Sequence, residues 1–299
     1  MGKLLICDPV DAGAIEEIRA AGIEVDVRDD ITQAGLAEII GEYEGMVVRS
    51  RTKVRQDILE KAGTLKVIIR GGVGLDSIDV AYAQSKGIDV RNTPEANSNA
   101  VVELVLGMML ALARHVTVAD ASMKAGKWEK KALKGTEITG KTLGIIGYGR
   151  IGQMLTEKAK ALGMQVVAYD PFVEDPAVVS FETLLASSDY ISLHIPLTEQ
   201  TANLIDKDAF AKMRRGAYLI QASRGGTVDE AALYDALVDG TLAGAGLDVF
   251  SAEPPEGTLL EKLIGLPQVI ATPHIGAATA EAQARVGSEV VKLAKAYFA

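Results

Sequence analysis

A glycine-rich turn and a carboxylate that follows it carry the clearest chemical signal in the sequence. Residues 147–152 read Gly-Tyr-Gly-Arg-Ile-Gly, and Asp170 stands at the end of the next apolar run. In a turn between a strand and a helix, Gly147 allows a sharp change of direction, Gly149 lets the backbone approach a pyrophosphate, and Gly152 lets the helix pack close to the sheet. Unpaired N–H groups at the start of such a helix favour an anion. The spacing therefore predicts a dinucleotide-binding turn.

The segments around the turn have the order that such a site requires. An apolar run at 143–146 predicts a buried parallel strand. A helical pattern then extends to Gly163, and a second apolar run at 165–169 ends at Asp170, which can accept hydrogen bonds from both hydroxyls of a ribose. A 2′-phosphate would be repelled by this carboxylate, and residues 161–206 contain no Arg or Lys to offset it. Glycine-rich turns occur in other α/β proteins, but the complete order predicts an NAD site rather than an NADP site.

Two arginine-bearing segments follow apolar runs in the first third of the chain. Residues 49–51 (Arg-Ser-Arg) directly follow a run at 46–48, and residues 70–72 (Arg-Gly-Gly) directly follow one at 67–69. Ligands of open α/β sheets bind at the carboxyl ends of strands, and a guanidinium suits phosphate and carboxylate alike. One such arginine alone would be a solvated surface residue, whereas two segments at equivalent strand ends favour an anion site. The candidate substrate-binding residues are Arg49, Arg51, Arg70, Gly71 and Gly72.

Charged or titratable side chains follow three later apolar runs. We expect these runs to be strands of the nucleotide-binding domain. These runs lie at 217–220, 244–247 and 269–271. Arg224 follows the first, Asp248 and Glu253 follow the second, and His274 follows the third. A cation, a carboxylate and an imidazole are therefore expected at three strand ends on the cofactor side of the sheet.

The whole chain alternates short apolar runs with helical patterns, which is typical of α/β proteins with parallel sheets. Residues 1–97 contain no nucleotide motif, so they are expected to form a domain with another task. A helix expected at 281–298 has no place in the second domain and should return to the first. We therefore predict two doubly wound parallel-sheet domains: a Rossmann NAD-binding domain at 98–274, and a discontinuous flavodoxin-like substrate-binding domain made of 1–97 and 275–299.

Composition argues against several classes of partner. The net charge of −9 argues against nucleic acid, because phosphate binding needs a basic face. The single cysteine, Cys7, excludes a disulfide framework and fits a reducing compartment. The longest apolar stretch, residues 104–113, is too short to span a bilayer, and the N-terminus does not resemble a signal peptide. We expect a cytoplasmic protein with neither a membrane partner nor a metal site.

The segment that joins the two domains suggests self-association. A helix expected at about 100–119 is apolar on most of its circumference, which suits an interface as well as a core. Residues 123–141 are more polar and contain the only tryptophan, Trp128, among several lysines. A solvated surface is the alternative for such a lysine run. We expect the helix and an arm at residues 123–133 to build a homodimer, or a dimer of dimers.

Taken together, these motifs resemble those of the D-2-hydroxyacid dehydrogenase family. The matching segments are residues 147–152 with Asp170, 194–198 (His-Ile-Pro-Leu-Thr), 223–226 (Ser-Arg-Gly-Gly), 246–250 (Gly-Leu-Asp-Val-Phe), 253–255 (Glu-Pro-Pro) and 273–277 (Pro-His-Ile-Gly-Ala). The first domain is similar to the D-3-phosphoglycerate dehydrogenase branch through residues 47–50, 70–76 and 92–97. The sequence ends at residue 299, before the regulatory ACT domain of longer members, so we expect no inhibition by serine through such a domain.

The resemblance implies a role for each candidate residue. His274 would accept the proton of a 2-hydroxyl as hydride leaves C2 for the nicotinamide, with Glu253 pairing to the imidazole. Arg224 would hold the substrate carboxylate and polarise the C2 oxygen. The implied cofactor-binding residues are Val73, Gly147, Gly149, Arg150, Ile151, Gly152, Asp170, Ile195, Pro196, Ala222, Ser223, Asp248, Gly276 and Ala277, with Asp248 at the nicotinamide carboxamide. We expect His194, which ends a strand, to be a satisfied structural residue.

The function that these observations favour is NAD-dependent oxidation of D-3-phosphoglycerate to 3-phosphohydroxypyruvate, a step of serine biosynthesis. The alternative within the family is a glyoxylate or hydroxypyruvate reductase, or another D-2-hydroxyacid dehydrogenase. A substrate without phosphate needs less positive charge at Arg49, Arg51 and Arg70. A more remote alternative, from a different class, is an NAD(H)-sensing corepressor; such proteins are usually larger, and here all three catalytic positions are filled.

Overall fold

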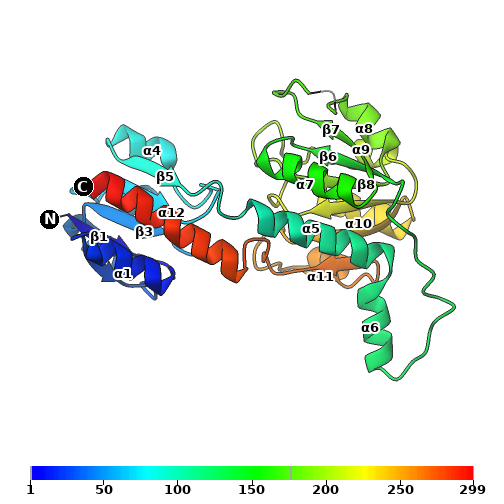
Figure 1. The fold of residues 1–299 in the computed structure, drawn as a ribbon, viewed down its shortest axis with the longest axis horizontal. Helices are drawn as coiled ribbons and strands as arrows, with labels where there is room; N and C mark the ends of the chain where they lie inside the picture. The colour runs from blue at the N-terminus through cyan, green and yellow to red at the C-terminus, as the bar shows by residue number, and fades with distance from the viewer. Residues whose placement is uncertain (1, 176, 299) are drawn as a thin grey trace. The chain divides into compact units, whose positions relative to one another are not determined.

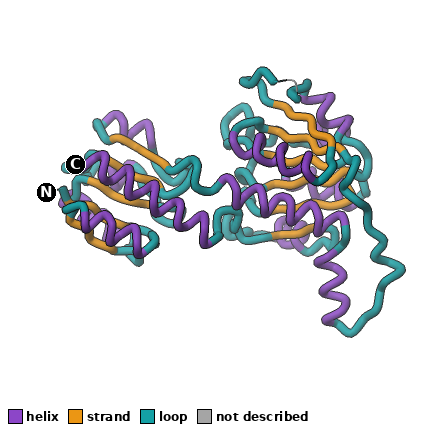
Figure 2. The backbone as a smooth tube through the Cα atoms, in the orientation of Figure 1, coloured by secondary structure: helices purple, strands orange, loops and turns teal. Residues whose placement is uncertain are grey.

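The computed structural model describes residues 2–175 and 177–298, and the chain divides into two compact units. The first unit consists of residues 1–98 and 277–299, and the second of residues 99–276. The boundaries expected from the sequence lie within two residues of these. Each unit is an α/β fold built on a parallel sheet (Figures 1 and 2).

The first unit contains a five-stranded parallel sheet in the order β2-β1-β3-β4-β5, the flavodoxin-like order. The strands are β1 (Lys3–Ile6), β2 (Glu24–Val27), β3 (Gly45–Val48), β4 (Val67–Arg70) and β5 (Asp89–Asn92). The helices are α1 (Ala12–Ala20), α2 (Gln33–Ile39), η1 (Ile40–Glu42), α3 (Gln56–Leu59), α4 (Val80–Ser85) and α12 (Ala280–Phe298).

Successive side chains of a strand point to opposite faces of the sheet, so this unit has two cores, one on each face. Leu4 and Ile6 belong to a core with α1 and α12, whereas Leu5 belongs to a core with α2, α3 and α4. Helix α12 presents Val286, Val290 and other small apolar residues to the first of these cores and packs along α1. The C-terminal helix is therefore part of the first unit, and it brings residues near 283 to the strand end that bears Arg49.

The second unit contains a six-stranded parallel sheet in the order β11-β10-β9-β8-β6-β7. The strands are β6 (Thr142–Ile146), β7 (Gln165–Tyr169), β8 (Tyr190–Leu193), β9 (Ala217–Gln221), β10 (Leu242–Leu247) and β11 (Val269–Ala271). The helices are α5 (Ser98–Ala113), α6 (Val116–Lys124), α7 (Arg150–Ala161), α8 (Phe181–Ser187), α9 (Lys207–Lys212), α10 (Glu230–Val238) and α11 (Thr258–Ile264). Because β6 has β7 on one side and β8 on the other, the chain reverses its direction of travel there, and such a switch point is where these sheets bind ligands.

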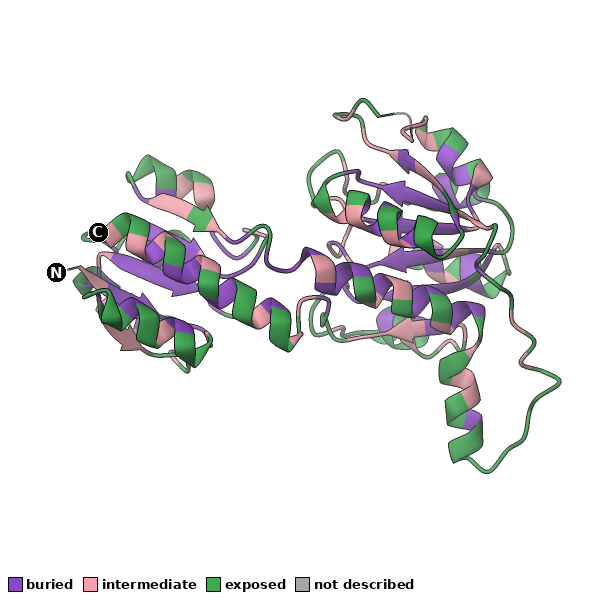
Figure 3. Ribbon diagram, in the orientation of Figure 1, coloured by how far each residue is buried: buried purple, intermediate pink, exposed green. Residues whose placement is uncertain are grey.

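The central strands of the second unit are buried (Figure 3), and their apolar side chains belong to two separate cores. Leu143 and Ile145 of β6 pack with α5 and α7, whereas Ile146 packs in the core that includes residues of α8, α9, α10 and α11. A strand that is covered on both faces reads as a continuous apolar run. This is why the six strands of this sheet could be recognised from the sequence.

One expected helix is two helices. The sequence predicts a single helix at about 100–119, but α5 ends at Ala113 and α6 begins after His115, whose φ of 53° lies in the left-handed region. The two helices are bent by 65°. The carbonyl of Ala113 accepts a hydrogen bond from the N–H of Thr136 at 2.8 Å, which replaces the bond that a continuing helix would supply. The break therefore depends on a contact with a segment more than twenty residues away in the sequence.

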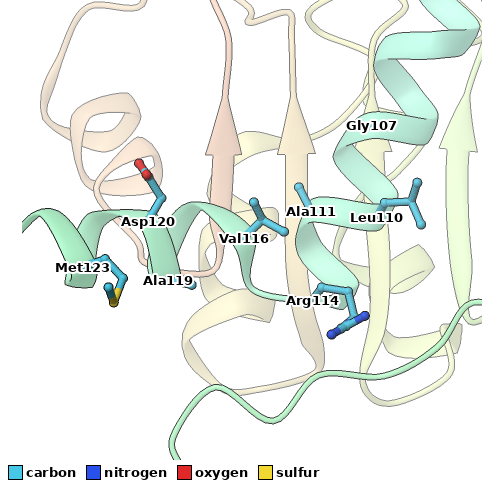
Figure 4. A pocket seen from close by; sticks show the side chains of 8 residues that line it. All are labelled: Gly107, Leu110, Ala111, Arg114, Val116, Ala119, Asp120 and Met123. Atoms are coloured by element: carbon cyan, nitrogen blue, oxygen red, sulfur yellow. The ribbon is translucent and has the colours of Figure 1, made fainter. Parts of the chain in front are cut away.

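Helix α6 and the segment that follows it are largely exposed (Figure 3). Residues 125–141, all of which are described, contain no helix or strand (Figure 2). A groove between α5 and α6 is lined by Gly107, Leu110, Ala111, Arg114, Val116, Ala119, Asp120 and Met123 (Figure 4). Within the described residues no single helix is long and apolar enough to cross a membrane, and α5 with α6 passes that test of length and composition only as a bent pair.

Candidate active site

The glycine-rich turn connects β6 to α7 at the switch point of the second sheet. Gly147 has a φ of 96°, and a Cβ there would collide with the carbonyl of His194. A Cβ on Gly149, by contrast, would meet no atom within 4 Å, so its backbone is open to an approaching ligand. Gly149 is also the N-cap of α7, and as a glycine it offers no side chain to cap the helix. An open backbone at a helix N-terminus fits a pyrophosphate.

Asp170 at the end of β7 is tied to this turn. Its Oδ2 accepts the N–H of Tyr148 at 2.8 Å, and its Oδ1 accepts the N–H of Phe172 at 3.0 Å. Each carboxylate oxygen has a second lone pair, so both can still accept a hydroxyl hydrogen. The carboxylate thus stands beside the turn with capacity for the two hydroxyls of a ribose.

The segment after β8 borders the same turn. Ile195 and Pro196 follow β8, and the Cβ position of Gly147 lies 2.9 Å from Ile195 Cγ2. Thr201 Oγ1 donates to the carbonyl of Pro196 at 2.6 Å, which fixes the loop. Ile195 and Pro196 are therefore close to the site expected for the cofactor.

His194 is only partly satisfied. Its ring Nε2 lies 2.9 Å from Ser192 Oγ, and its backbone N–H donates to the carbonyl of Ile146 at 2.7 Å. Its buried Nδ1 has no hydrogen-bond partner among the described residues. Burial lowers the pKa of His194 to about 4, so the ring is neutral at neutral pH. The sequence predicts a structural histidine with satisfied ring nitrogens. Nε2 agrees with this prediction, whereas Nδ1 does not.

An imidazole and a carboxylate meet beyond β10 and β11. His274 Nδ1 lies 2.7 Å from Glu253 Oε2, and the other oxygen of Glu253 accepts the N–H of Phe250 at 3.2 Å. The side chains of His274 and Glu253 are 46% and 37% exposed, so both remain accessible. A carboxylate on Nδ1 leaves Nε2 as the nitrogen that can exchange a proton with a substrate.

Asp248 organises the loop that carries His274. Its carboxylate is buried and accepts hydrogen bonds from Thr272 Oγ1 at 2.5 Å and from the N–H groups of Ile275 and Gly276, each at 2.8 Å. The backbone N–H of His274 donates to the carbonyl of Asp248 at 2.9 Å. Within the unit Asp248 therefore shapes the histidine loop, and its contact with a nicotinamide carboxamide stays a prediction.

The loop after β9 presents Arg224. Its backbone carbonyl accepts the side-chain amide of Gln221 and the hydroxyl of Thr227, both at 2.9 Å. Gln221 Oε1 also accepts the hydroxyl of Ser223 at 2.8 Å. The buried Gln221 therefore holds the loop that includes Ala222 and Ser223. We did not predict this residue, although a polar side chain at the end of an apolar strand was a visible signal.

In the first unit, Arg49 and Arg70 lie at the ends of the adjacent strands β3 and β4, in which Val48 pairs with Arg70. Arg49 Nη1 donates to Gln283 Oε1 of α12 at 2.5 Å and to the carbonyl of Pro9 at 3.4 Å. Arg70 Nη2 donates to Ser50 Oγ at 3.3 Å. Burial lowers the pKa of the Arg49 guanidinium, while the charge of Asp8 raises it.

Gly71 and Gly72 make room for these two arginines. The Cβ position of Gly71 lies 3.4 Å from Arg49 Cγ. Gly72 has a φ of 144°, and a Cβ there would collide with the guanidinium of Arg70. A side chain at Gly72 would therefore displace that guanidinium and strain the backbone as well.

Arg51 was predicted as a substrate-binding residue, but in the structure its side chain donates to acceptors within the first unit. Its Nε donates to Asp8 Oδ1 at 3.0 Å, its Nη1 to the carbonyl of Ile31 at 3.1 Å, and its Nη2 to the carbonyls of Cys7 and Asp29. Its nitrogens are thus committed to structural acceptors, and its charge is paired with the buried Asp8. This geometry favours a structural role, so we leave Arg51 out of the proposed substrate site.

Residues 106–276 match the family of D-isomer specific 2-hydroxyacid dehydrogenases, over its NAD-binding domain. The chain belongs to that family. NAD is accordingly its cofactor, and the enzyme is an NAD-dependent oxidoreductase that acts on D-2-hydroxy acids. The turn at Gly147 and Asp170 is the part of the second unit that fits this cofactor.

Relatives of this 2-hydroxyacid dehydrogenase have different substrates in their names. It is 49% identical to a hydroxypyruvate reductase of Thermotoga maritima, over 97% of this chain and 96% of the relative. It is 44% identical to a D-3-phosphoglycerate dehydrogenase of Archaeoglobus fulgidus, over 98% of this chain but only 57% of the relative. The chain thus spans little more than half the length of the D-3-phosphoglycerate dehydrogenases that it matches.

Solved structures share the fold of this chain. The TT0316 protein of Thermus thermophilus matches with a TM-score of 0.88 and 35% identity, covering 97% of this chain and 94% of the other. A D-lactate dehydrogenase of Aquifex aeolicus, complexed with NAD and lactic acid, matches with a TM-score of 0.85 and 29% identity, covering 99% and 95%. The predicted fold class, two doubly wound parallel-sheet domains, is confirmed.

The remaining predicted cofactor residues of the dehydrogenase lie at element ends. Val73 is partly exposed beyond β4, and its carbonyl accepts the side-chain amide of Asn92 at 2.6 Å. Arg150 and Ile151 begin α7, and Ala277 follows the His274 loop. Among the described residues no group of three or more His, Cys, Asp or Glu side chains could hold a metal ion.

Proposed function

We propose that this enzyme oxidises D-3-phosphoglycerate to 3-phosphohydroxypyruvate with NAD, as a step of serine biosynthesis. The observation that supports the phosphorylated substrate is the pair of guanidinium groups at the ends of β3 and β4. The Arg49 guanidinium donates to neutral acceptors, and among the described residues no carboxylate forms a salt bridge with it; the nearby Asp8 carboxylate accepts the backbone N–H of Arg49 instead. Its charge therefore remains available to an anion such as a phosphate.

The proposed catalytic residues all belong to the second unit. His274 Nε2 takes the proton of the 2-hydroxyl as the C2 hydrogen leaves as hydride. Glu253 fixes the ring through Nδ1 and stabilises the imidazolium that forms. Arg224 binds the substrate carboxylate and polarises the C2 oxygen. NAD supplies the acceptor for the hydride. In the reverse direction the imidazolium returns its proton to the oxygen of a 2-oxo acid.

Asp170 supports a preference for NAD over NADP. Its two oxygens stand beside the glycine-rich turn and keep capacity for two ribose hydroxyls. A 2′-phosphate would bring a like charge to this carboxylate, which is unfavourable.

Reduction of hydroxypyruvate or glyoxylate is the second candidate function. The 49% identity to a hydroxypyruvate reductase over nearly the whole of both chains favours it. The two candidates differ in the 3-phosphate and therefore in the need for Arg49 and Arg70.

The arginine pair provides the test. Arg49→Ala should lower kcat/KM for D-3-phosphoglycerate roughly 10- to 150-fold, since one charge-assisted hydrogen bond is worth about 1.5–3 kcal/mol. The same variant should lose much less with D-glycerate, which is the same molecule without the phosphate. Arg28→Ala is the matched control, because Arg28 is an exposed arginine directly after β2 that pairs with Asp26. Equal losses with both substrates would show that Arg49 serves the fold or the carboxylate instead.

We also propose a homodimer formed through α5, α6 and the arm at 123–133, whose first two residues end α6. Large apolar side chains are exposed there: Val116 is 52%, Met123 55% and Trp128 78% exposed. Obligate interfaces are rich in such side chains. Light scattering at micromolar concentration should give twice the mass of one chain, and Met123→Asp should shift the equilibrium to the monomer. A wild-type mass of one chain would contradict the proposal.

A further inference from the structure

The loop that carries Glu253 is fastened to helix α10 by a second glutamate. Ser251 donates its N–H to Glu230 Oε1 at 2.8 Å and its hydroxyl to Glu230 Oε2 at 2.5 Å. Both oxygens of the Glu230 carboxylate are therefore used by one residue of the loop. Two charge-assisted bonds to the same residue fix its position and its orientation.

The side-chain cap of helix α10 does not involve Glu230. Glu230 is the first residue of α10, where a glutamate is usually explained by the helix dipole. The N-cap, however, is Asp229, whose Oδ1 already accepts the N–H groups of Ala231 and Ala232 at 3.0 and 3.1 Å. The Glu230 side chain contacts the loop instead.

Helix α10 is a firm support for the loop. Its residues Leu233, Ala236 and Leu237 are buried in the larger core of the second unit. The loop also packs against the turn after β9, where a Cβ on Gly225 would collide with the carbonyl of Phe250. The segment around Ser251 is thus held between α10 and the turn that follows Arg224.

A continuous series of contacts leads from Ser251 to the imidazole. Ser251 is preceded by Phe250, whose N–H donates to Glu253 Oε1, and Glu253 Oε2 contacts His274 Nδ1. Displacement of Ser251 would move Phe250 and Glu253 together. The ring of His274 is itself 46% exposed and depends on Glu253 for its orientation.

We propose that Glu230 is a positioning residue for the Glu253–His274 pair, acting through Ser251. This inference rests on the proposed acid–base role of His274. Loss of the Glu230 carboxylate should leave the pyrophosphate and ribose contacts of the cofactor intact, because the glycine-rich turn and Asp170 follow β6 and β7, which are separated from β10 by β8 and β9 in the sheet order. It should instead reduce the rate of proton and hydride transfer, since small misplacements of catalytic groups are costly.

The test is a double-mutant cycle between Glu230→Ala and Glu253→Gln, with kcat and the KM for NAD measured on the best 2-hydroxy acid substrate. Alone, Glu230→Ala should lower kcat roughly 10- to 100-fold with the KM for NAD unchanged. In the Glu253→Gln background the same change should cost less than about threefold, because the residue through which it acts has already been altered. Glu230→Gln should restore most of the rate, since its amide can accept the Ser251 N–H and donate to the hydroxyl.

Two controls separate the possible outcomes. Asp235→Ala removes another exposed carboxylate of α10 and should leave kcat unchanged. Ser251→Ala, which keeps the backbone N–H, should give a smaller loss than Glu230→Ala. Equal losses from Glu230→Ala in the two backgrounds, or none in wild type, would overturn the inference. If Glu253→Gln alone left kcat unchanged, the proposed acid–base role would be wrong instead.

Discussion

His274 Nδ1 lies 2.7 Å from Glu253 Oε2, and this contact joins the loops that follow β10 and β11. Since a carboxylate only accepts hydrogen bonds, Nδ1 carries the proton of the neutral ring. Nε2 is then the basic nitrogen. The pair has the arrangement of a general base with its orienting partner.

The first prediction concerns this pair. Glu253→Gln should lower kcat for oxidation by on the order of 10²-fold, because the amide can donate to Nδ1 and favour the wrong tautomer. Glu256→Gln, an exposed change on the same loop, is the control. An unchanged kcat in Glu253→Gln would contradict the assignment.

The second prediction concerns Asp170. Asp170→Ser should lower kcat/KM with NAD about tenfold or more and should raise it with NADP, since the change removes both an acceptor and a repulsive charge. Glu182→Ser removes a surface carboxylate of α8 and should change neither value. Steady-state rates with the two cofactors measure the effect. If wild type already uses both cofactors equally well, the proposed role of Asp170 is lost.

The third prediction follows from the buried His194. Burial lowers its pKa from 6.5 to about 4, so between these values the unfolded chain binds a proton that the folded chain does not. The free energy of unfolding should therefore fall as pH decreases through this window, by roughly 2 kcal/mol between about pH 7.5 and about pH 5. His194→Gln keeps a group that can bond to Ser192 but cannot take up the proton. Chemical denaturation of both proteins at the two pH values should show a smaller loss in the variant, and equal losses would refute this account.

The sequence was informative where local chemistry determines structure. The strands of the second unit are covered on both faces, so apolar runs such as 143–146 identified them directly. The glycine-rich turn was recognisable because Gly147 and Gly152 answer local steric demands, since a Cβ at either position would collide with a backbone carbonyl, and Gly149 leaves its backbone open.

Long-range contacts account for what could not be predicted. The break at His115 depends on Thr136, and the structural role of Arg51 depends on Asp8 and on carbonyls from the segment after β2. Glu230 resembled an ordinary first-turn glutamate, because nothing local reveals that its carboxylate contacts Ser251. In each case the deciding partner is distant in the sequence.

The central claim is that the enzyme acts on a phosphorylated D-2-hydroxy acid. The most direct test is the ratio of kcat/KM for D-3-phosphoglycerate to that for D-glycerate, measured on the unmutated enzyme with NAD. Two guanidinium contacts to the phosphate predict a ratio on the order of 10² or more. A ratio near one, together with faster reduction of hydroxypyruvate than of 3-phosphohydroxypyruvate, would contradict the claim.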